Sequence, residues 1–444
     1  MKTALILQDT YTPDIHYKTY AASYIAFLLR KNGFRAYTLD RFGHFSYDEL
    51  DQLASRYKNI DYLGISAAWM FKAISNRLNV SDVDYNTPKI AKLHHFIKQV
   101  NPGKVVVGGN AIELPLGNAR YVNGKNEEDI FKAFDILVPK YRSDIQTLEH
   151  RYTNDDFILP RETLPLEISR GCIFNCKFCS FSLRGRDKFD YNRDPKLIGD
   201  QIEYNRDKFG STNYYITCDT FNDTTSKIEG IANMLSKRNL KISFVCYLRH
   251  DLLHAFPEQI PILRDMGLRG AQFGLETFNH QSGKAIGKGM HPDKVKELLF
   301  KLQKEWPLTR LMSIFIVGLP HSTLDEHHAT VEWIKSNDTL SFAMFYPLFL
   351  NPNKEYGSEF ANNADKYGYE LNLDASWKYK DLFTFDDVTK KATELNKEMN
   401  GNSLSGGIWN EMAYLRDNSW ESIMAGTHKK SVYFDEYKAL LELV

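Results

Sequence analysis

The chain contains little cysteine and no long apolar run. Five cysteines occur among 444 residues, and this low, odd number argues against a framework of disulfides. No stretch of about 18 apolar residues is present, so no membrane-spanning helix is expected. The opening residues MKTALILQDTYTPD show no signal-peptide pattern. The expected location is therefore the reducing cytoplasm, where clustered cysteines bind metal or act in catalysis more often than they form crosslinks.

An excess of charge of either sign is also absent. Lys+Arg and Asp+Glu number 56 each, and no basic run occurs, so the sequence gives no indication of a nucleic-acid partner or a membrane surface. Hydrophobic residues make up 43% and aromatic residues 13% of the chain, which is sufficient for substantial cores and large pockets. The length predicts two or three domains.

Residues 1–142 alternate short apolar segments with amphipathic ones. The segments TALILQD, FRAYTLD, YLGISAA and KVVVGGN are typical of buried strands, and segments such as KTYAASYIAFLLRKNG are typical of helices. This alternation predicts an α/β, Rossmann-like domain with a parallel sheet covered on both faces. Such sheets bind ligands beyond the carboxyl ends of their strands. Candidate binding residues therefore lie in 8–14, 66–69 and 108–110.

The alternation restarts after a polar segment, 143–162, which is predicted to be a linker. Residues 163–350 contain six strand-like segments separated by helical ones: LPLEISRG, NYYITCD, ISFVCYL, GAQFGLE, LMSIFIVGL and SFAMFYPLF. Six βα units are too few for a complete eight-stranded barrel, so a partial (β/α)6 barrel is expected. Residues 351–444 are predicted to form an α-rich C-terminal extension. Its aromatic residues either line a substrate pocket or form a core: Tyr356, Trp377, Tyr379 and Trp420.

Three of the five cysteines fall within the short segment GCIFNCKFC, as Cys172, Cys176 and Cys179. Structural zinc requires four ligands, commonly in two Cys pairs or with His. No second pair follows, and no histidine lies between His150 and His250. An iron–sulfur cluster fits the three cysteines better. One loop can hold three irons of a cubane cluster and leave the fourth open to chelate an amino acid.

The segment CIFNCKFC resembles the C-x3-C-x-aromatic-C motif of radical S-adenosylmethionine (SAM) enzymes, with Phe178 as the aromatic residue. The resemblance implies that the three cysteines hold a 4Fe–4S cluster. It also implies that the reduced cluster cleaves SAM to methionine and a 5′-deoxyadenosyl radical. The cofactors carry that chemistry, and the protein orients the reacting atoms and excludes water.

Four later segments resemble SAM-binding elements of the same family, in the same order along the chain. TCDTFND resembles the element that holds the methionine amine, and YLRHDLL places a basic residue after the third strand. FGLETFN resembles the ribose-binding element, and IFIVGLPHSTLDE resembles the element against adenine. The residues so implied to contact SAM are Asp219, Arg249, Glu276 and Gly318, together with Phe178. The resemblance covers about residues 160–350.

Residues 1–142 resemble the cobalamin-binding domain that precedes the barrel in one subgroup of radical SAM enzymes. The matching segments are YLGISAAWM and GKVVVGGN, which imply that Ser66 and Gly108–Gly109 lie against the cobalamin tail. The cobalt-ligating Asp-x-His-x-x-Gly motif is not intact, because DIHYKT has Thr19 where glycine belongs. Radical SAM relatives commonly lack this histidine, so cobalamin stays an expected cofactor and His16 is expected to be an ordinary loop residue. The alternative is a Rossmann-like module that binds nothing.

The remaining cysteines and one histidine pair have open roles. Cys218 and Cys246 end the second and third barrel strands, where active-site groups gather, and are candidate catalytic residues. Cysteine also often serves as a small buried hydrophobic residue. The pair His327–His328 lacks a third metal ligand nearby and is expected on the solvated surface of a helix.

The sequence therefore predicts a cobalamin-dependent radical SAM enzyme, a methyltransferase that acts on an unactivated carbon. The first alternative is an enzyme that uses only the 5′-deoxyadenosyl radical, for a rearrangement, oxidation or cyclisation. The second is a non-catalytic iron–sulfur sensor. A methylthiotransferase fits less well, because residues 1–171 contain no cysteine for a second cluster. The expected partners are a small-molecule, lipid or peptide substrate and an electron donor such as flavodoxin or ferredoxin.

Overall fold

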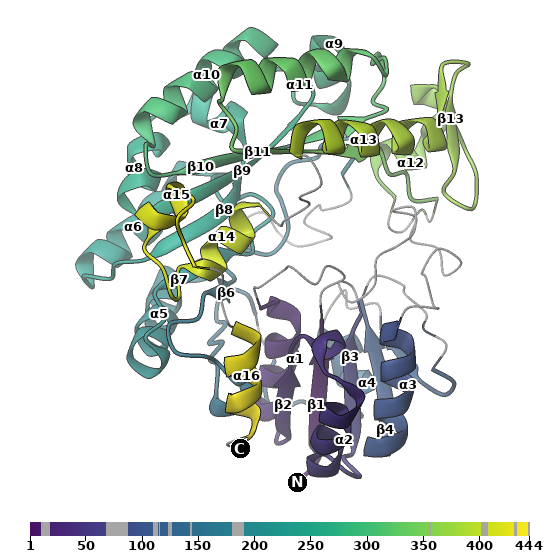
Figure 1. Ribbon diagram of the computed structural model, residues 1–444, viewed down its shortest axis with the longest axis vertical. Helices are drawn as coiled ribbons and strands as arrows, with labels where there is room; N and C mark the ends of the chain where they lie inside the picture. The colour runs from purple at the N-terminus through teal and green to yellow at the C-terminus, as the bar shows by residue number, and fades with distance from the viewer. Residues whose placement is uncertain are drawn as a thin grey trace. The chain divides into compact units, whose positions relative to one another are not determined.

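Figure 1 shows the computed structural model, which describes residues 1–9, 18–67, 88–109, 114, 116–122, 127–142, 144–179, 191–352, 354, 357–400, 407–429 and 433–442. These residues divide into two compact units. The first consists of residues 1–160 together with 432–444, and the second of residues 161–431. None of the helices in the described ranges has the length and apolar character needed to cross a membrane.

The described part of the first unit has a five-stranded sheet. Its strands are β1 (Thr3–Gln8), β2 (Arg35–Leu39), β3 (Tyr62–Ser66), β4 (Lys104–Gly108) and β5 (Arg120–Val122). All neighbours pair in parallel, in the order β2-β1-β3-β4-β5. The helical segments are α1 (Tyr20–Lys31), η1 (Phe42–His44), α2 (Tyr47–Arg56), α3 (Pro88–Val100), α4 (Glu127–Ala133), η3 (Asn154–Asp156) and α16 (Tyr433–Glu442). The predicted Rossmann-like sheet is thus confirmed.

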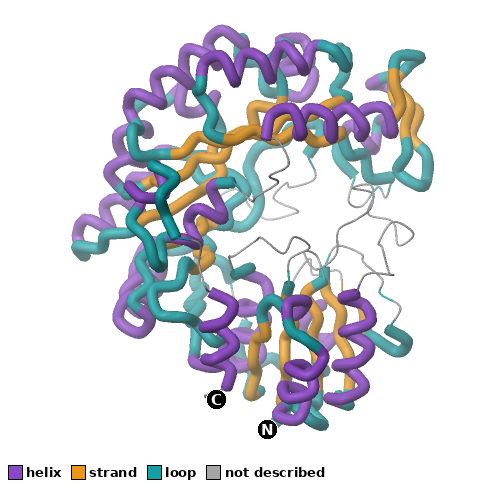
Figure 2. The backbone as a smooth tube through the Cα atoms, viewed as in Figure 1, coloured by secondary structure: helices purple, strands orange, loops and turns teal. Residues whose placement is uncertain are grey.

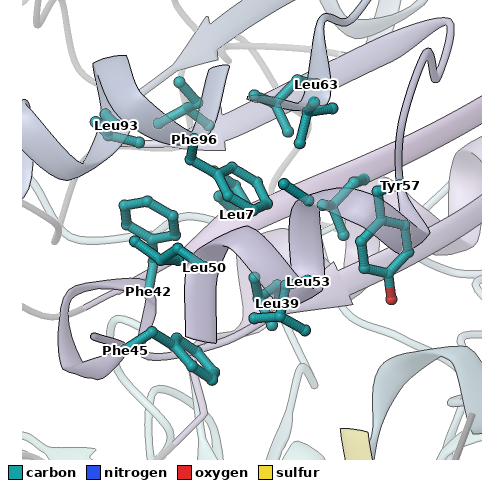
Figure 3. Packing of buried hydrophobic residues seen from close by; sticks show 14 of the residues in the cluster. Leu7, Leu39, Phe42, Phe45, Leu50, Leu53, Tyr57, Leu63, Leu93 and Phe96 are labelled. Atoms are coloured by element: carbon teal, nitrogen blue, oxygen red, sulfur yellow. The ribbon is translucent and has the colours of Figure 1, made fainter. Parts of the chain in front are cut away.

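Alternate residues of β1 enter two different hydrophobic cores. Leu5 and Leu7 belong to one core, shown in Figure 3, which also receives side chains from α2 and α3. Ala4 and Ile6 belong to the other core, against α1. Successive side chains of a strand point to opposite faces, so both faces of the sheet are covered. This explains why the interior of β1, residues 4–7, is apolar without interruption.

Two segments belong to the first unit although the sequence did not predict it. The predicted linker is a packed part of this unit, because Ile145, Leu148 and Phe157 are buried in its cores. The helix α16 also belongs to it, although it lies at the end of the predicted C-terminal extension. Tyr437 and Leu441, four residues apart on one helical face, enter the core shown in Figure 3.

The second unit contains a six-stranded parallel sheet. Its strands are β6 (Leu164–Leu166), β7 (Asn213–Ile216), β8 (Ser243–Leu248), β9 (Leu268–Glu276), β10 (Arg310–Val317) and β11 (Phe342–Pro347). They lie in sequence order across the sheet. The intervening helices are α5 (Pro195–Phe209), α6 (Thr225–Lys237), α7 (His250–Ala255), α8 (Gln259–Asp265), α9 (His280–Ile286), α10 (Pro292–Glu305) and α11 (Glu326–Asn337). The expected partial barrel is confirmed.

The sheet of the second unit is curved, with helices along its convex side (Figure 2). On β7 and β8 the residues Tyr214, Ile216, Phe244 and Leu248 are fully buried. The residues between them point to the concave side by the alternation of a strand. On that side Tyr215 and Val245 are buried, whereas Tyr247 keeps 37% of its surface exposed.

The rest of the second unit adds a small sheet and several helices. Strands β12 (Tyr369–Leu371), β13 (Trp377–Tyr379) and β14 (Phe383–Thr384) form an antiparallel sheet that the α-rich prediction did not include. The other segments are α12 (Glu359–Asn362), η4 (Ala364–Tyr367), α13 (Phe385–Asn400), α14 (Ile408–Tyr414) and α15 (Trp420–Met424). Trp377, Tyr379 and Trp420 are all buried and serve as core. Tyr356 lies outside the described residues.

Candidate active site

The three cysteines of the predicted cluster loop lie after β6, at the carboxyl end of the first barrel strand. All three are half-buried. The amide of Cys179 donates to the carbonyl of Cys176 at 3.0 Å, which folds the loop into a turn. The loop is held on both sides at Lys177. Its amide donates to the Ile286 carbonyl of α9 at 3.2 Å, and its carbonyl accepts from the amide of Phe360 in α12 at 2.9 Å.

The thiols of this loop face polar partners from neighbouring strand ends. The Sγ atom of Cys172 lies 3.4 Å from Oγ1 of Thr220, which follows β7. Among the described residues no three His, Cys, Asp or Glu side chains are already gathered closely enough to hold a metal ion. The donor set itself fits a cluster, since three thiols on one pinned loop are the ligands that iron–sulfur clusters use.

Arg249 follows β8 and reaches the cluster loop. Its Nη1 atom donates to Sγ of Cys176 at 3.1 Å, and its guanidinium lies 4.1 Å from the centre of the Phe174 ring. Its Nε atom donates to Oδ1 of Asp251 at 3.0 Å, and Nη2 donates to Oδ2 at 2.5 Å. Burial lowers the pKa of the guanidinium, but Asp251 and Cys176 raise it by more, so Arg249 keeps its charge. The predicted SAM residue therefore contacts the cluster loop.

The backbone of Arg249 is fixed by a buried asparagine. The side chain of Asn222 accepts from the Arg249 amide at 2.8 Å and donates to its carbonyl at 3.0 Å. Asn222 is completely buried, so this clamp sets where the strand β8 ends. The sequence reasoning missed Asn222, although it lies three residues after the predicted Asp219. Asp219 itself is exposed at the end of β7.

Glu276 ends β9 in a left-handed backbone conformation, with φ of 65°. Its Oε1 atom is 2.7 Å from Nζ of Lys288, in an ion pair that is more than nine-tenths buried. Lys288 also donates to the carbonyl of Gly274 at 2.9 Å and lies 5.7 Å from the centre of the Phe178 ring. Lys288 thus connects the predicted ribose carboxylate to the cluster loop. No motif in the sequence pointed to it.

Gly318 follows β10 with φ of 96°. A Cβ atom at this position would lie 2.8 Å from the Trp377 ring. The carbonyl of Gly318 accepts from the Tyr369 hydroxyl at 2.7 Å. The positive φ and the close ring both require glycine here. The backbone conformation at this position therefore requires the glycine that the sequence predicted for the adenine element.

The predicted cobalamin residues lie together at the carboxyl edge of the first unit's sheet. Gln8 of β1 pairs with Ser66 of β3, which pairs with Gly108 of β4. Gly109 has φ of 126°. The order of the strands changes direction between β1 and β3, and sheets of the order 2-1-3-4-5 bind ligands at this switch point. The motif residues Asp14 and His16 lie outside the described residues.

A buried polar network, which the sequence did not predict, lies next to this edge. The Gln8 amide nitrogen donates to Oδ1 of Asp40 at 2.7 Å, and Lys18 forms a buried ion pair with the same carboxylate. The Asp40 amide donates to the Tyr437 hydroxyl at 2.9 Å. Helix α16 is thereby joined to the end of β2.

Cys218 and Cys246 lie on the side of the sheet away from the concave face. Both are completely buried, and burial raises the pKa of each thiol. The Ser169 amide donates to Sγ of Cys218 at 3.2 Å. These surroundings are typical of cysteines that serve as small buried hydrophobic residues, and they do not favour a catalytic role. A chemical role for either cysteine stays a prediction that its position disfavours.

The histidine pair on α11 is divided between core and surface. His327 is buried, contrary to the expectation of a solvated pair, and burial lowers its pKa to about 4. Its ring lies 6.2 Å from the ring of Phe345. His328 is partly exposed and its Nδ1 atom lies 2.9 Å from Oε2 of Glu398. Adjacent helix residues point about 100° apart, so only one of the pair can enter the core.

The partial barrel and its three-cysteine loop define the class of this part of the chain. The family model of the radical SAM superfamily matches residues 166–334. This segment is a radical SAM domain.

Relatives of the chain include two named methyltransferases. An uncharacterized methyltransferase of Pyrococcus horikoshii is 28% identical over 223 residues, which cover 50% of this chain and 45% of the relative. A bacteriochlorophyllide d C-8(2)-methyltransferase of Chlorobaculum tepidum is 24% identical over 199 residues, covering 42% of this chain and 41% of the relative. The chain thus aligns with less than half the length of these curated relatives.

Solved structures share the fold over larger parts of the chain. The radical SAM methyltransferase TsrM of Kitasatospora setae, with cobalamin and a 4Fe–4S cluster bound, matches with a TM-score of 0.61. That match covers 100% of both chains at 13% identity. The cobalamin-dependent radical SAM enzyme OxsB matches with a TM-score of 0.51, covering 83% of this chain and 56% of that one at 15% identity. Both units of this chain therefore have their counterparts in one known fold.

Proposed function

We propose that the protein is a cobalamin-dependent radical SAM methyltransferase that acts on an unactivated carbon. One observation carries the proposal. The barrel brings the three-cysteine loop and the predicted SAM residues to the carboxyl ends of its strands, in a chain whose other unit has the 2-1-3-4-5 sheet. The named methyltransferases and the whole-length fold match to TsrM support it.

The cluster loop would hold the iron–sulfur cluster through Cys172, Cys176 and Cys179. When bound, the reduced cluster supplies the electron that cleaves the SAM sulfonium, and cobalamin supplies a methyl carrier. Arg249 orients Cys176 and brings a positive charge to its sulfur. An electron donor such as flavodoxin or ferredoxin and a cytoplasmic location belong to the same proposal, because such a cluster requires a reducing compartment.

The SAM residues would act through their positions at neighbouring strand ends. Asp219 would accept hydrogen bonds from the methionine ammonium, and Glu276 would hold the ribose hydroxyls. Lys288 fixes the orientation of the Glu276 carboxylate through its 2.7 Å ion pair. Gly318, whose missing side chain leaves room for the Trp377 ring, would present its backbone to the adenine ring. In the first unit Ser66, Gly108 and Gly109 would hold the cobalamin tail.

The decisive experiment is anaerobic reconstitution with iron, sulfide and hydroxocobalamin, followed by reduction with SAM present. We expect both 5′-deoxyadenosine and corrin that stays with the protein through gel filtration. Deoxyadenosine without corrin would support an enzyme that uses only the 5′-deoxyadenosyl radical. An intact cluster with neither product would favour the sensor and contradict the proposal.

Two variants test the two units separately. Deoxyadenosine formation reports on the second unit, and retained corrin reports on the first. Cys176→Ala should abolish deoxyadenosine formation, whereas Cys218→Ala, which removes a thiol outside the loop, should not. Ser66→Leu should reduce the retained corrin without altering the iron content. Corrin that is retained equally by Ser66→Leu would remove this residue from the proposed cobalamin site.

A further inference from the structure

The hydroxyl group of Thr220 contacts the first cysteine of the cluster loop. Thr220 follows β7 and is buried, and its Oγ1 atom lies 3.4 Å from Sγ of Cys172. A thiolate that binds iron carries no proton, so with a cluster bound the hydroxyl group would be the donor. Hydrogen bonds to a metal ligand orient that ligand and tune the metal. Thr220 is therefore placed to act on a cluster through Cys172.

A second contact holds the backbone that leads into the loop. The amide of Arg170, two residues before Cys172, donates to the carbonyl of Tyr191 at 3.0 Å. The hydroxyl group of Tyr191 in turn donates to Oδ2 of Asp223 at 2.7 Å. Both Tyr191 and Asp223 are buried. Asp223 thus fixes, through one buried ring, the segment from which Cys172 follows.

Both contacts end at one buried ion pair. Nζ of Lys227, on α6, lies 2.6 Å from Oδ1 of Asp223, and the two side chains are 4% and 1% exposed. The same Nζ atom donates to the carbonyl of Thr220 at 3.2 Å. It also lies 5.7 Å from the centre of the Tyr191 ring. The pair therefore connects the residue that contacts the Cys172 sulfur with the residue that holds the backbone before it.

Stability alone does not explain this ion pair. Burying two charges costs desolvation energy that their attraction barely repays, and an apolar pair of similar volume is often at least as stable. The SAM contact that the sequence predicted in TCDTFND requires only Asp219, and it gives Asp223 no role. The common feature of the contacts of Asp223 and Lys227 is that they lead to Cys172.

We propose that Asp223 and Lys227 are positioning residues, which hold Cys172 as a preformed cluster ligand and aim the Thr220 hydroxyl group at its sulfur. This inference rests on the proposed function, because it requires the iron–sulfur cluster. A hydrogen bond to a ligand sulfur favours the reduced cluster and so raises its reduction potential. A fixed loop backbone slows the loss of iron. The two contacts therefore act on two properties, the reduction potential and the retention of the cluster.

The first test measures the reduction potential of the full-length, anaerobically reconstituted protein by potentiometric titration followed by EPR. Thr220→Val keeps the shape of the side chain but removes its hydroxyl group. It should shift the reduction equilibrium about threefold toward the oxidised cluster, which lowers the potential by about 28 mV at 59 mV per tenfold change. Thr220→Ser keeps the hydroxyl group and should have the native potential. Thr309→Val is the control, because its buried hydroxyl group donates to the carbonyl of Leu268.

A double variant tests whether the ion pair acts through Thr220. Asp223→Asn combined with Lys227→Met removes both charges and leaves the net charge of the site unchanged. It should lower the potential as Thr220→Val does, and should lower it no further when added to Thr220→Val. Arg30→Met combined with Asp156→Asn removes a comparable pair from the first unit and should leave the potential unaltered.

The release of iron to EDTA tests the contact with the backbone. Tyr191→Phe loses the hydrogen bond to Asp223 and should release iron about fivefold faster, as expected for the loss of one ordinary hydrogen bond. Its potential should stay native, because the Thr220 hydroxyl group is kept. Tyr62→Phe is the matched control, since the Tyr62 hydroxyl group donates to Asp135 at the same 2.7 Å in the first unit.

Three results would overturn the inference. These are a native potential in Thr220→Val, a full shift by the double variant where the hydroxyl group is already absent, or native iron release in Tyr191→Phe. Deoxyadenosine formation together with any of them would contradict the positioning role alone. The expected shifts in a protein that forms no deoxyadenosine would contradict the proposed enzyme alone. A native protein that assembles no cluster would overturn both.

Discussion

Arg249 donates a hydrogen bond to the sulfur of Cys176, with Nη1 and Sγ 3.1 Å apart. A hydrogen bond to a ligand sulfur withdraws electron density from a cluster and raises its reduction potential. With the proposed cluster on Cys176, Arg249 would therefore tune its potential, in addition to the contact with SAM that the sequence predicted.

Replacing Arg249 should therefore lower the reduction potential of the reconstituted cluster. We expect Arg249→Gln to shift it by tens of millivolts, since about 59 mV corresponds to a tenfold change for one electron. Potentiometric titration followed by EPR measures the shift. Arg264→Gln, which removes an exposed arginine paired with Asp265, is the control. A potential unchanged in Arg249→Gln would show that the hydrogen bond has no electronic effect.

Removing one partner of the buried ion pair between Glu276 and Lys288 should strongly lower the free energy of unfolding. Lys288→Met leaves a buried carboxylate without its cation, and should cost about 3–5 kcal/mol of the free energy of unfolding. The double variant Glu276→Gln with Lys288→Met should recover part of this loss. Urea unfolding followed by tryptophan fluorescence reports on this unit, because five of the six tryptophans follow residue 300. Additive losses would mean that the pair is not coupled.

Cys218 and Cys246 should be dispensable for chemistry. Both are buried on the convex side of the sheet, so Cys218→Ala and Cys246→Ala should each cost about 1 kcal/mol of stability. Deoxyadenosine formation per cluster should be that of the native protein. An activity loss of tenfold or more in either variant, at unchanged iron content, would restore the catalytic role that the sequence suggested.

Helix α16 should stabilise the first unit through Tyr437. Truncation of this buried ring in Tyr437→Ala should cost about 3–5 kcal/mol, and Tyr437→Phe, which loses the hydrogen bond with the Asp40 amide, about 1 kcal/mol. Hydrogen exchange of amides in β2 and α2 measures both effects. Asp435→Ala, which changes an exposed residue of the same helix, is the control. Equal protection in all three variants would show that α16 is not needed for the core.

The second unit should lose stability in mild acid because of His327. Its pKa of about 4 in the folded protein lies below the ordinary value of about 6.5. The unfolded chain therefore takes up a proton first as the pH falls, and stability decreases between about pH 6.5 and 4. His327→Leu should flatten this dependence of the melting temperature, and His328→Leu should not. Identical pH profiles for native protein and His327→Leu would contradict the argument.

Much of the fold was predictable because its signals are local. The apolar runs of β1, β3 and β4 predict the first sheet, and those of β9 and β10 predict the second. The motif of Cys172, Cys176 and Cys179 predicts a cluster loop. Gly318 was predicted from the local motif IFIVGLPHSTLDE, and the structure adds that its backbone has a positive φ. These properties depend on residues close together in the chain.

Other properties were decided by contacts between distant residues, which no local pattern contains. Strand alternation places Cys218 behind the sheet and Asp219 in front of it, but the sequence does not say which side is open. Lys288 reaches Glu276 only because α9 returns the chain to the end of β9. The helix α16 belongs to the first unit and not to the extension, because Tyr437 packs into the core of the first unit. The sequence by itself thus determined the two parallel α/β sheets and the loop with three cysteines. The tertiary structure decided which side chains meet. Hydrophobic burial depends on the total apolar area removed from water and not on how far apart the residues are in the chain.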